Sequence, residues 1–388
     1  GGAGVKAVYT AEMAAKAASD RLGLHLTPWA GVAALTSADQ ALEGQAYCFL
    51  PLPAFTGMPV HVNGFFELSN NRRDIWYGSD MAGDGKTRSD WNVALLCDVV
   101  APAYVQLLLD AASELGWCGQ YFQLWPRATG REPWAGVVRA LYQLLFDAAV
   151  LRTELGGGKW IPPDVAVLSD DSVDYSEELT QVMFRKGLPV VVPPAHIREM
   201  LGTAQSRDVC QLSPALVRRL LLQLTSSAAG ERQPVGGAFG AAMSAREQRA
   251  VSLAQKQSDA SLSRDECLLL LRYCLSDLRG SGLMYMQGLA LIPTADGKAA
   301  TFGPIDASTQ VYTCGQLEYD LLLESQPSFL VDRSIPEDLY AILASTQLQE
   351  SCNVRTLNPR TLARLFDMGT LPATWKRCPE VQWSGTGA

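Results

Sequence analysis

Short apolar runs and turn residues dominate the first part of the chain. The runs YCFLPL (47–52) and MPVHVNGFFEL (58–68) predict two β-strands, since both are brief and rich in aromatic or β-branched residues. The adjacent pair Asn63 and Gly64 predicts a turn, because both residue types tolerate a positive φ. The apolar positions of the second strand are Met58, Val60, Val62 and Phe65. A polar segment, 69–88, follows and predicts an exposed loop.

Apolar residues spaced three or four apart then predict helices. Residues 10–23 form the first, and a long helix is expected to begin near Ser89. Pro102 interrupts that helix, which predicts a kink or a pair of helices. Residues 134–155 form another, ending at Gly156–Gly158. These three glycines are the best candidate for a domain boundary.

The second half of the chain alternates irregularly between helical and strand patterns. The predicted strands lie in 159–170, 188–194 and a hairpin at 288–303. The predicted helices are 176–187, 195–202, 213–224, 334–345 and 358–369. The fold class expected from this alternation is α+β (mixed α/β), with at least two domains.

Residues 226–261 differ from their surroundings. They are rich in Ala, Gly, Ser and Gln and poor in large apolar side chains. Such a segment buries too little surface to offset the entropy lost on ordering, so we expect a flexible insertion. Within it, 244–257 has the pattern of a marginal helix.

Composition narrows the function classes. The 388 residues are 48% hydrophobic and 19% charged, as is ordinary for a globular protein, and the net charge is −8. This charge argues against a general nucleic-acid binder, which needs a basic surface. No uninterrupted apolar run approaches the roughly 18 residues of a membrane span, and the N-terminus lacks the layout of a signal peptide. We therefore expect no nucleic-acid partner and no membrane span.

Cysteines and histidines give no sign of a metal site. The nine cysteines are odd in number and none shows C-x-x-C spacing, which favours free buried thiols in a reducing, cytoplasmic location. The three histidines, His25, His61 and His196, are far apart along the chain. Asp170, Asp171 and Asp174 resemble an acidic metal loop, but lack the spacing of an EF-hand. We expect them in an exposed loop.

Signatures of catalysis are also missing from the sequence. No serine lies in a G-x-S-x-G context, and His61 and His196 have no catalytic neighbours in sequence, so both are expected to be structural. The tryptophans at 117, 125 and 134 are expected to fill the core. We predict that the chain is not an enzyme and has no catalytic residues.

Several segments resemble the repeat region of the sacsin family, both in their residues and in their order along the chain. In the first half they are FLPLP (49–53), TGMPVHVNGFFELSNNRRDIW (56–76) and WNVALLCDVVAPAYVQLLLDAA (91–112). In the second half they are KWIPPDVAVLSDD, RKGLPVVVPPAHIREML, LSPALVRRLLL and GLALIPTADGKAATFG. Apart from the insertion, the resemblance runs from about Pro28 to Trp375.

The resemblance implies both a fold and a role. In this family the region follows an ATPase domain of the heat-shock, gyrase and MutL type. The first domain, 1–156, would be a ribosomal-S5-like transducer, and 157–388 a smaller α/β domain. The implied function is a chaperone role in protein folding, coupling the ATPase to clients or co-chaperones. The implied partners are thus the upstream ATPase domain and client proteins. ATP and magnesium would belong to that ATPase, with no cofactor in this chain.

The ATPase motifs themselves are not found. The segment Asp80–Gly85 is rich in glycine, but lacks a flanking strand and helix start of the required kind. The glycines at 156–158 follow a predicted helix end, where the helix dipole repels phosphate. Neither is a good nucleotide cradle.

Three cations in the polar loop are the candidate functional residues. In MutL and its relatives, a basic residue on a transducer loop reaches the γ-phosphate held by the preceding domain. By this resemblance Arg72, Arg73 or Lys86 would stabilise charge that develops on the phosphoryl oxygens. The alternative is that they are solvated or paired with Asp74, Asp80 or Asp84. The competing function is an ATP-independent scaffold or protein-interaction module.

Overall fold

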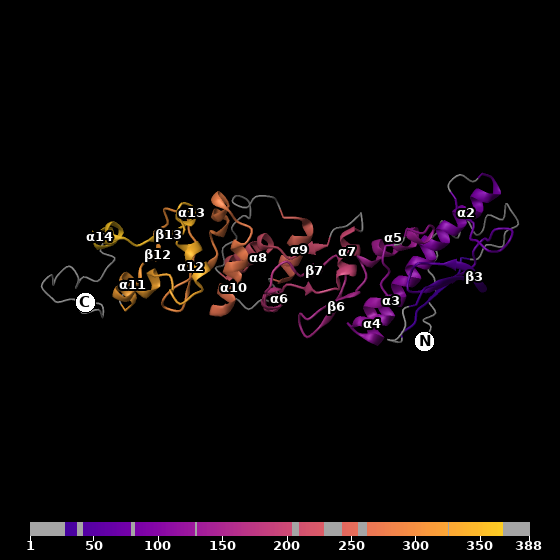
Figure 1. Ribbon diagram of the computed structural model, residues 1–388, viewed down its shortest axis with the longest axis horizontal. Helices are drawn as coiled ribbons and strands as arrows, with labels where there is room; N and C mark the ends of the chain where they lie inside the picture. Colours follow the sequence, from indigo (N-terminus) through magenta and orange to yellow (C-terminus); the bar gives the residue numbers. More distant parts are fainter. Residues whose placement is uncertain are drawn as a thin grey trace. The chain divides into compact units, whose positions relative to one another are not determined.

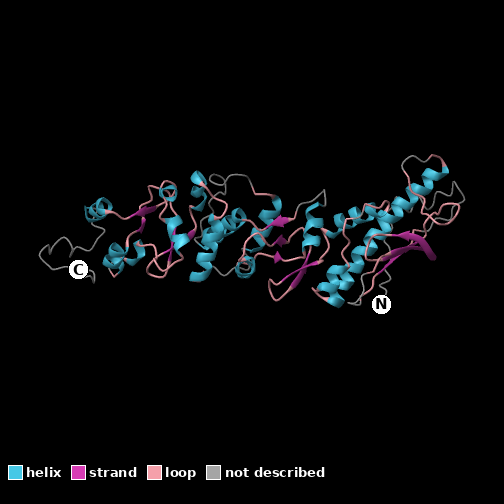
Figure 2. Ribbon diagram, viewed as in Figure 1, coloured by secondary structure: helices cyan, strands magenta, loops and turns pink. Residues whose placement is uncertain are grey.

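The protein is a mixed α/β chain with several small sheets (Figure 1, Figure 2). The computed structural model describes residues 28–36, 42–78, 82–128, 130–203, 209–228, 243–254, 262–324 and 326–367. The helix expected at 10–23 lies outside these residues. The chain divides into two compact units, Gly1–Ser169 with Pro189–Gln211, and Asp170–Leu188 with Leu212–Ala388. The expected mixed α/β class is confirmed.

A four-stranded sheet begins the first unit. Its strands are β1 (Ala30–Ala33), β2 (Gln45–Cys48), β3 (Leu50–Phe55) and β4 (His61–Gly64), in the order β1-β4-β2-β3. Strand β4 pairs antiparallel with β1 and parallel with β2, and β3 is an edge strand. Ala46 and Val62 face the core, so the period-two pattern fixes which face of the sheet is buried.

The reversal between strands occurs at Phe49, not at Asn63 and Gly64. YCFLPL is divided between β2 and β3 by Phe49, whose φ is 60°. The predicted Asn63-Gly64 turn is wrong, because both residues lie in β4 opposite β1. Gly64 is required there by close packing, since a Cβ would lie 3.0 Å from the Phe66 ring. Glycine at this position therefore reports a close approach and not a turn.

One continuous helical segment follows the sheet (Figure 1). It comprises α2 (Asp84–Leu95), the π-helical turn η1 (Leu96–Val100) and α3 (Ala101–Leu115). The predicted start near Ser89 is wrong, since the helix begins after Gly83, whose φ is 58°. Pro102 does not divide it into two helices. The proline lies in the first turn of α3, where the π-helical turn shifts the hydrogen-bond register.

By length and composition, helix 84–115 could cross a membrane, and it is the one such helix among the residues described. Of its most apolar window, 61% is buried against the rest of the protein. Trp91, Leu95 and Tyr104 contribute to the core of the first unit. Packing against the core of the first unit therefore explains why this helix is so apolar.

The predicted helix at 134–155 is too long. Helix α4 (Gly119–Gln123) precedes α5 (Trp134–Leu145), and β5 (Leu151–Thr153) then pairs with β6 (Lys159–Ile161) in a hairpin. Gly156–Gly158 form the turn, with φ values of 67°, 86° and 93°. The three glycines thus lie inside the first unit, and the chain first passes into the second unit between Ser169 and Asp170.

A small parallel sheet completes the first unit. It consists of β7 (Val167–Leu168), β8 (Val190–Val191) and β9 (Cys210–Gln211), in the order β8-β7-β9. Helix α7 (Ala195–Thr203) lies between β8 and β9 in sequence. The apolar strand predicted at 188–194 is confirmed as β8, buried as expected for a parallel strand.

The second unit is mainly helical. Its helices are α6 (Ser176–Arg185), α8 (Pro214–Ala228), α9 (Ala245–Ala254), α10 (Arg264–Leu275), η2 (Gly280–Met286), α11 (Gln316–Leu323), η3 (Pro327–Phe329), α12 (Glu337–Leu343), α13 (Thr346–Gln349) and α14 (Pro359–Asp367). Its strands form two pairs, β10 (Ala290–Pro293) with β11 (Ala299–Thr301), and β12 (Val311–Thr313) with β13 (Val354–Thr356). The hairpin predicted around Asp296 and Gly297 is confirmed.

Part of the segment expected to be flexible is a packed helix. Ala250, Val251 and Ala254 on α9 are buried, and Glu247 contacts Arg219 of α8 at 3.5 Å. The expected flexibility is therefore wrong for 243–254, whereas the helix expected within 244–257 is confirmed as α9. Residues 229–242 and 255–261 lie outside those described. Small residues permit this packing, because a Cβ on Gly187 would lie 2.7 Å from the Ala254 carbonyl oxygen.

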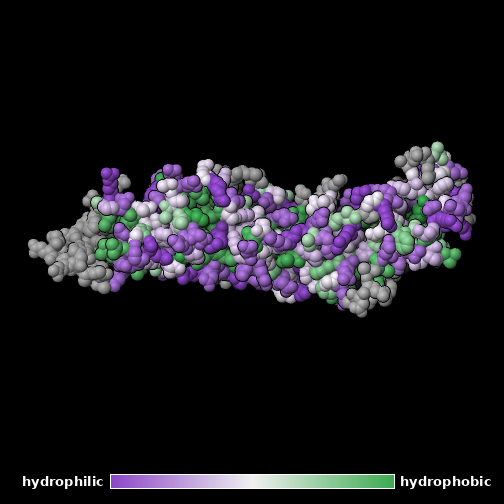
Figure 3. All heavy atoms as spheres, viewed as in Figure 1, coloured by the Kyte–Doolittle hydropathy of each residue, from purple (hydrophilic) through white to green (hydrophobic). Residues whose placement is uncertain are grey.

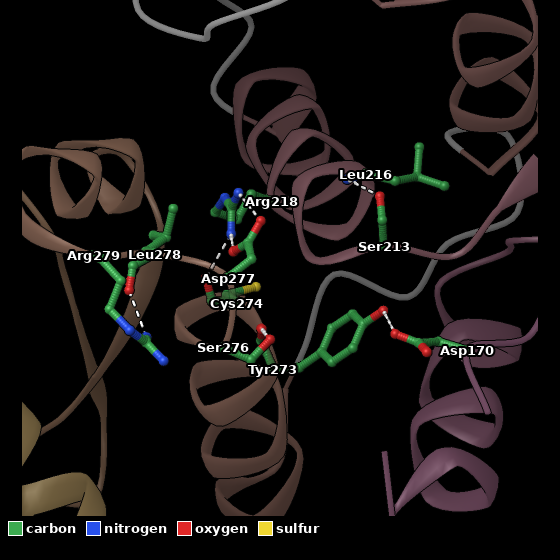
Figure 4. A network of polar contacts seen from close by, with 10 residues as sticks. All are labelled: Asp170, Ser213, Leu216, Arg218, Tyr273, Cys274, Ser276, Asp277, Leu278 and Arg279. Atoms are coloured by element: carbon green, nitrogen blue, oxygen red, sulfur yellow. Dashed lines mark hydrogen bonds and ion pairs between the residues drawn. The ribbon is translucent and has the colours of Figure 1, made fainter. Parts of the chain in front are cut away.

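An ion pair joins buried Arg218 of α8 to partly exposed Asp277, two residues past the end of α10 (Figure 4). Arg218 of α8 donates to both carboxylate oxygens of Asp277 at 2.6 and 3.0 Å, and to the Cys274 carbonyl at 2.6 Å. Nearby, the Tyr273 hydroxyl donates to Asp170 Oδ2 at 2.7 Å. Asp170 thus has a structural role, whereas Asp171 and Asp174 are exposed as expected.

Helix α10, which the periodicity did not reveal, begins with a capping box. The Glu266 backbone N–H donates to Ser263 Oγ, and the Ser263 N–H donates to Glu266 Oε2 at 2.7 Å. Arg185 also donates to Glu266 at 2.6 Å. Burial raises the pKa of the Glu266 carboxyl, but these bonds outweigh burial and leave the pKa below 4.5.

We expect Glu266→Gln to reduce the free energy of unfolding at pH 7 by about 1 kcal/mol. Because the folded-state pKa of Glu266 is lowered, its contribution is present above the unfolded pKa and is lost as pH falls through the folded pKa. Urea unfolding of both proteins from neutral to acidic pH checks this. The difference in the free energy of unfolding between the two proteins should become smaller in acid. Glu350→Gln, at an exposed carboxylate, should leave that free energy nearly unchanged at every pH. A difference that is constant with pH would contradict the lowered pKa of Glu266.

Candidate functional site

The two predicted arginines lie on an ordered turn. Leu68 and Ile75 form an antiparallel bridge, and we call residues 68–75 the arginine turn. The Ser69 N–H donates to the Asp74 carbonyl at 2.9 Å, and the Arg72 N–H to the Ser69 carbonyl at 2.8 Å. Arg72 has a φ of 56°. This part of the predicted loop therefore has a defined backbone.

Short polar side chains inside the turn set that conformation. Ser69 Oγ donates to Asn71 Oδ1 at 2.6 Å, and Asn71 Oδ1 also accepts from the Arg73 N–H at 3.0 Å. Ser69 Oγ also accepts from the Asp74 N–H at 3.2 Å. Ser and Asn favour such turns because their side chains bond to the nearby backbone.

A buried amide on helix α2 holds both arms of the turn. Asn92 is fully buried, and its Oδ1 accepts from the Glu67 N–H at 2.9 Å. Its Nδ2 donates to the Glu67 carbonyl at 2.8 Å and to the Trp76 carbonyl at 2.9 Å. One side chain thus binds the residues that enter and leave the turn. We call this set of bonds the Asn92 clamp.

Further contacts from α2 extend the clamp. The Ser89 hydroxyl donates to the Gly78 carbonyl at 3.2 Å and accepts from the Gly78 N–H at 3.1 Å. Trp91 Nε1 donates to the Phe65 carbonyl at 3.4 Å, and Arg88 pairs with Glu67 at 3.3 Å. The segment around the turn is therefore positioned by four residues of one helix.

The three candidate cations differ in their surroundings. Arg72 and Arg73 are exposed, and among the residues described no ion pair joins either to Asp74 or Asp84. Asp80 lies outside those residues. Lys86 lies in α2 and pairs with Asp90 at 3.6 Å, which is not one of the three expected aspartates. The structure brings the two arginines together on the turn and places Lys86 on a separate element.

A cleft of about 470 Å³ lies beside the turn, between α2–η1 and α5. Tyr77 donates to Glu132 Oε2 at 3.2 Å, and Arg139 pairs with Glu132 Oε1 at 3.1 Å. Burial raises the pKa of the Cys97 thiol in its wall, so the thiol is protonated at neutral pH. Tyr77, Glu132 and Arg139 thus bond to one another, and the cysteine of this cleft is not activated as a nucleophile.

The other residues singled out in the sequence have structural contacts. His61 Nδ1 accepts from the Gln45 N–H at 3.0 Å, and His196 Nε2 lies 3.2 Å from the Phe122 carbonyl. Trp125 and Trp134 are buried, and Trp117 packs edge-on against Trp160. In the part of the chain that is described, no three His, Cys, Asp or Glu residues are grouped as metal ligands.

Comparison with known proteins gives a similarity over part of the chain. The chain is 45% identical to human sacsin over 85 residues. This stretch is 22% of the chain but 2% of the length of sacsin. No protein-family model matches the chain, and no solved structure matches it. The similarity supports a sacsin-related region within the chain.

We expect Asn92→Ala to lower the free energy of unfolding by about 2–4 kcal/mol, because the Glu67 N–H and the Trp76 carbonyl lose their partner, while the Glu67 carbonyl keeps only the Trp76 N–H. The arginine turn should open more often than the rest of the unit. Urea unfolding and amide hydrogen exchange at residues 67–76 check both effects. Asn71→Ala, which alters the turn from within, is the matched control and should cost less. Unchanged exchange in Asn92→Ala would show that the clamp does not position the turn.

Proposed function

We propose that this chain is a non-catalytic section of a sacsin-like chaperone repeat, which couples an upstream ATPase domain to the binding of clients or co-chaperones. Similarity to sacsin over 85 residues supports the family context. The observation that carries the proposal is the arginine turn, which presents two exposed guanidinium groups on a backbone held by the Asn92 clamp.

The chemistry of phosphoryl transfer explains why such a turn suits this role. Negative charge spreads over the phosphoryl oxygens in the transition state, and a cation placed beforehand stabilises it without reorganisation. Arg72 or Arg73 would supply that cation to nucleotide held by the preceding domain. ATP and magnesium would be bound there, and this chain would contribute no cofactor site of its own.

Coupling requires that the turn and the helix move together. The clamp joins the turn to α2, which continues through η1 into α3. A displacement of the turn toward phosphate would therefore pull on a helix of the core of the first unit. On this proposal the first unit acts as a transducer-type domain in a cytoplasmic chaperone.

An ATP-independent scaffold is the competing function. Strongly exposed apolar residues on the first unit, Phe49 and Leu50, favour it, because such groups mark interaction surfaces. In this case the arginines would serve protein binding alone.

We expect Arg72→Ala or Arg73→Ala to lower kcat for ATP hydrolysis by about 100-fold, in a longer polypeptide that includes the upstream ATPase domain. The KM for ATP should change little, since the cation acts on the transition state. Lys86→Ala tests the third cation, and Arg127→Ala, at an exposed arginine away from the turn, is the matched control. Unchanged hydrolysis in all three candidate variants would favour the scaffold.

A further inference from the structure

Three aromatic rings pack together on the surface of the first unit. The Phe65 ring lies 5.2 Å from Trp29 and 4.8 Å from Phe49, measured between centroids, and the Phe49–Phe65 pair is stacked. Phe49 is 71% exposed, Trp29 is 42% exposed and the adjacent Leu50 is 75% exposed. We call Trp29, Phe49, Leu50 and Phe65 the aromatic ladder. Hydrophobic residues reach the surface at the end of this unit where β3 lies (Figure 3).

The backbone at Phe49 is unfavourable for a large side chain. Its φ of 60° lies in the left-handed region, where glycine is at ease and a bulky residue is strained. The Phe49 N–H is held in place by a bond to Asn63 Oδ1 at 3.2 Å. Core packing does not explain a ring here, because most of that ring is in solvent. Strain retained at an exposed aromatic residue is typical of a binding site.

The neighbouring edge strand is closed to strand addition. Pro51 and Pro53 lie on β3 and have no N–H groups to donate to another strand. Both prolines are exposed. A partner at this edge must therefore be bound through side chains, and the ladder offers rigid rings for such contacts.

Positive charge adjoins the ladder. The segment from Phe65 leads directly into the arginine turn, and Cys48 Sγ lies 3.7 Å from the Phe66 carbonyl. Burial raises the pKa of the Cys48 thiol, and the charge of Arg72 opposes this rise. Cys48, the residue before Phe49, therefore lies against the segment that leads into the arginine turn. The nearby carboxylate of Glu67 is already paired with Arg88. A chain of net charge −8 thus presents guanidinium groups beside exposed rings.

We propose that the aromatic ladder and Arg72 form a docking site for a polypeptide segment that combines acidic and apolar side chains. The rings and Leu50 would cover the apolar groups, and Arg72 would bind a carboxylate. This site does not require ATP or an upstream domain, so it can be tested in the present chain independently of the proposed coupling.

The test uses two fluorescently labelled synthetic peptides of equal length. In one, glutamate alternates with leucine, and in the other lysine replaces each glutamate. Fluorescence anisotropy with the full chain should show binding of the glutamate peptide, weakening as salt is raised, and markedly weaker binding of the lysine peptide.

Phe49→Gly separates binding from folding. Glycine suits the left-handed backbone, so the variant should remain as stable as the parent while its affinity for the glutamate peptide falls about tenfold or more. Arg72→Ala should weaken binding of the same peptide and reduce its salt dependence. Leu317→Ala removes another strongly exposed apolar side chain, from the second unit, and should bind as the parent does.

Four results would overturn the proposal. They are equal binding of both peptides, no binding of the glutamate peptide, and parental affinity in a folded Phe49→Gly variant. The fourth is self-association by sedimentation that Phe49→Gly abolishes, which would assign the ladder to a second copy of this chain. None of these depends on ATP hydrolysis, so failure here leaves the coupling proposal to its own test.

Discussion

The Asn92 amide is the interaction on which the candidate site depends. A fully buried amide loses its water, and it is stable only where its donor and acceptor groups find partners. Here those partners are backbone groups of Glu67 and Trp76, which bracket the arginine turn. The short bonds within the turn set its local shape, but they do not fix where it lies. The clamp fixes the position of the turn relative to the core. The two arginines of this exposed polar segment therefore extend from a backbone that is held in place.

The same helix serves both stability and positioning. Trp91 and Leu95 are buried in the core, while Arg88, Ser89 and Asn92 bond to the segment around the turn. A helix whose polar residues must be buried cannot show a clean amphipathic pattern. The sequence predicted a helix start near Ser89 because serine is a common N-cap residue. In the structure Ser89 lies inside α2, and its hydroxyl donates to the carbonyl of Gly78, which precedes the helix. The polar residues before Ser89, counted as loop, form the first turns of α2.

Most of the correct predictions rest on patterns with a local physical cause, whereas features set by distant contacts could not be predicted. The hairpin at Gly297, the parallel strand β8 and the helix ending near Gly187 follow from turn chemistry and burial. The Asn63-Gly64 turn failed because Gly64 is required by the Phe66 ring. At the site, the arginines could be singled out by resemblance. The clamp could not, since nothing in the sequence links Asn92 to residues 16 and 25 positions away. The capping box of α10 was visible as S-x-x-E and was missed.

Arg72 belongs to both proposals, and this has a physical consequence. A guanidinium group that contacts a phosphate cannot at the same time neutralise a carboxylate at the ladder, because each contact uses the same donors and the same charge. Engagement of nucleotide would therefore weaken the docking of an acidic segment, and docking would weaken engagement to the same degree, since coupling free energies are reciprocal. Arg73, on the same turn, could keep one contact while Arg72 makes the other. Two adjacent arginines would then permit partial coupling, whereas a single cation would make the two states mutually exclusive.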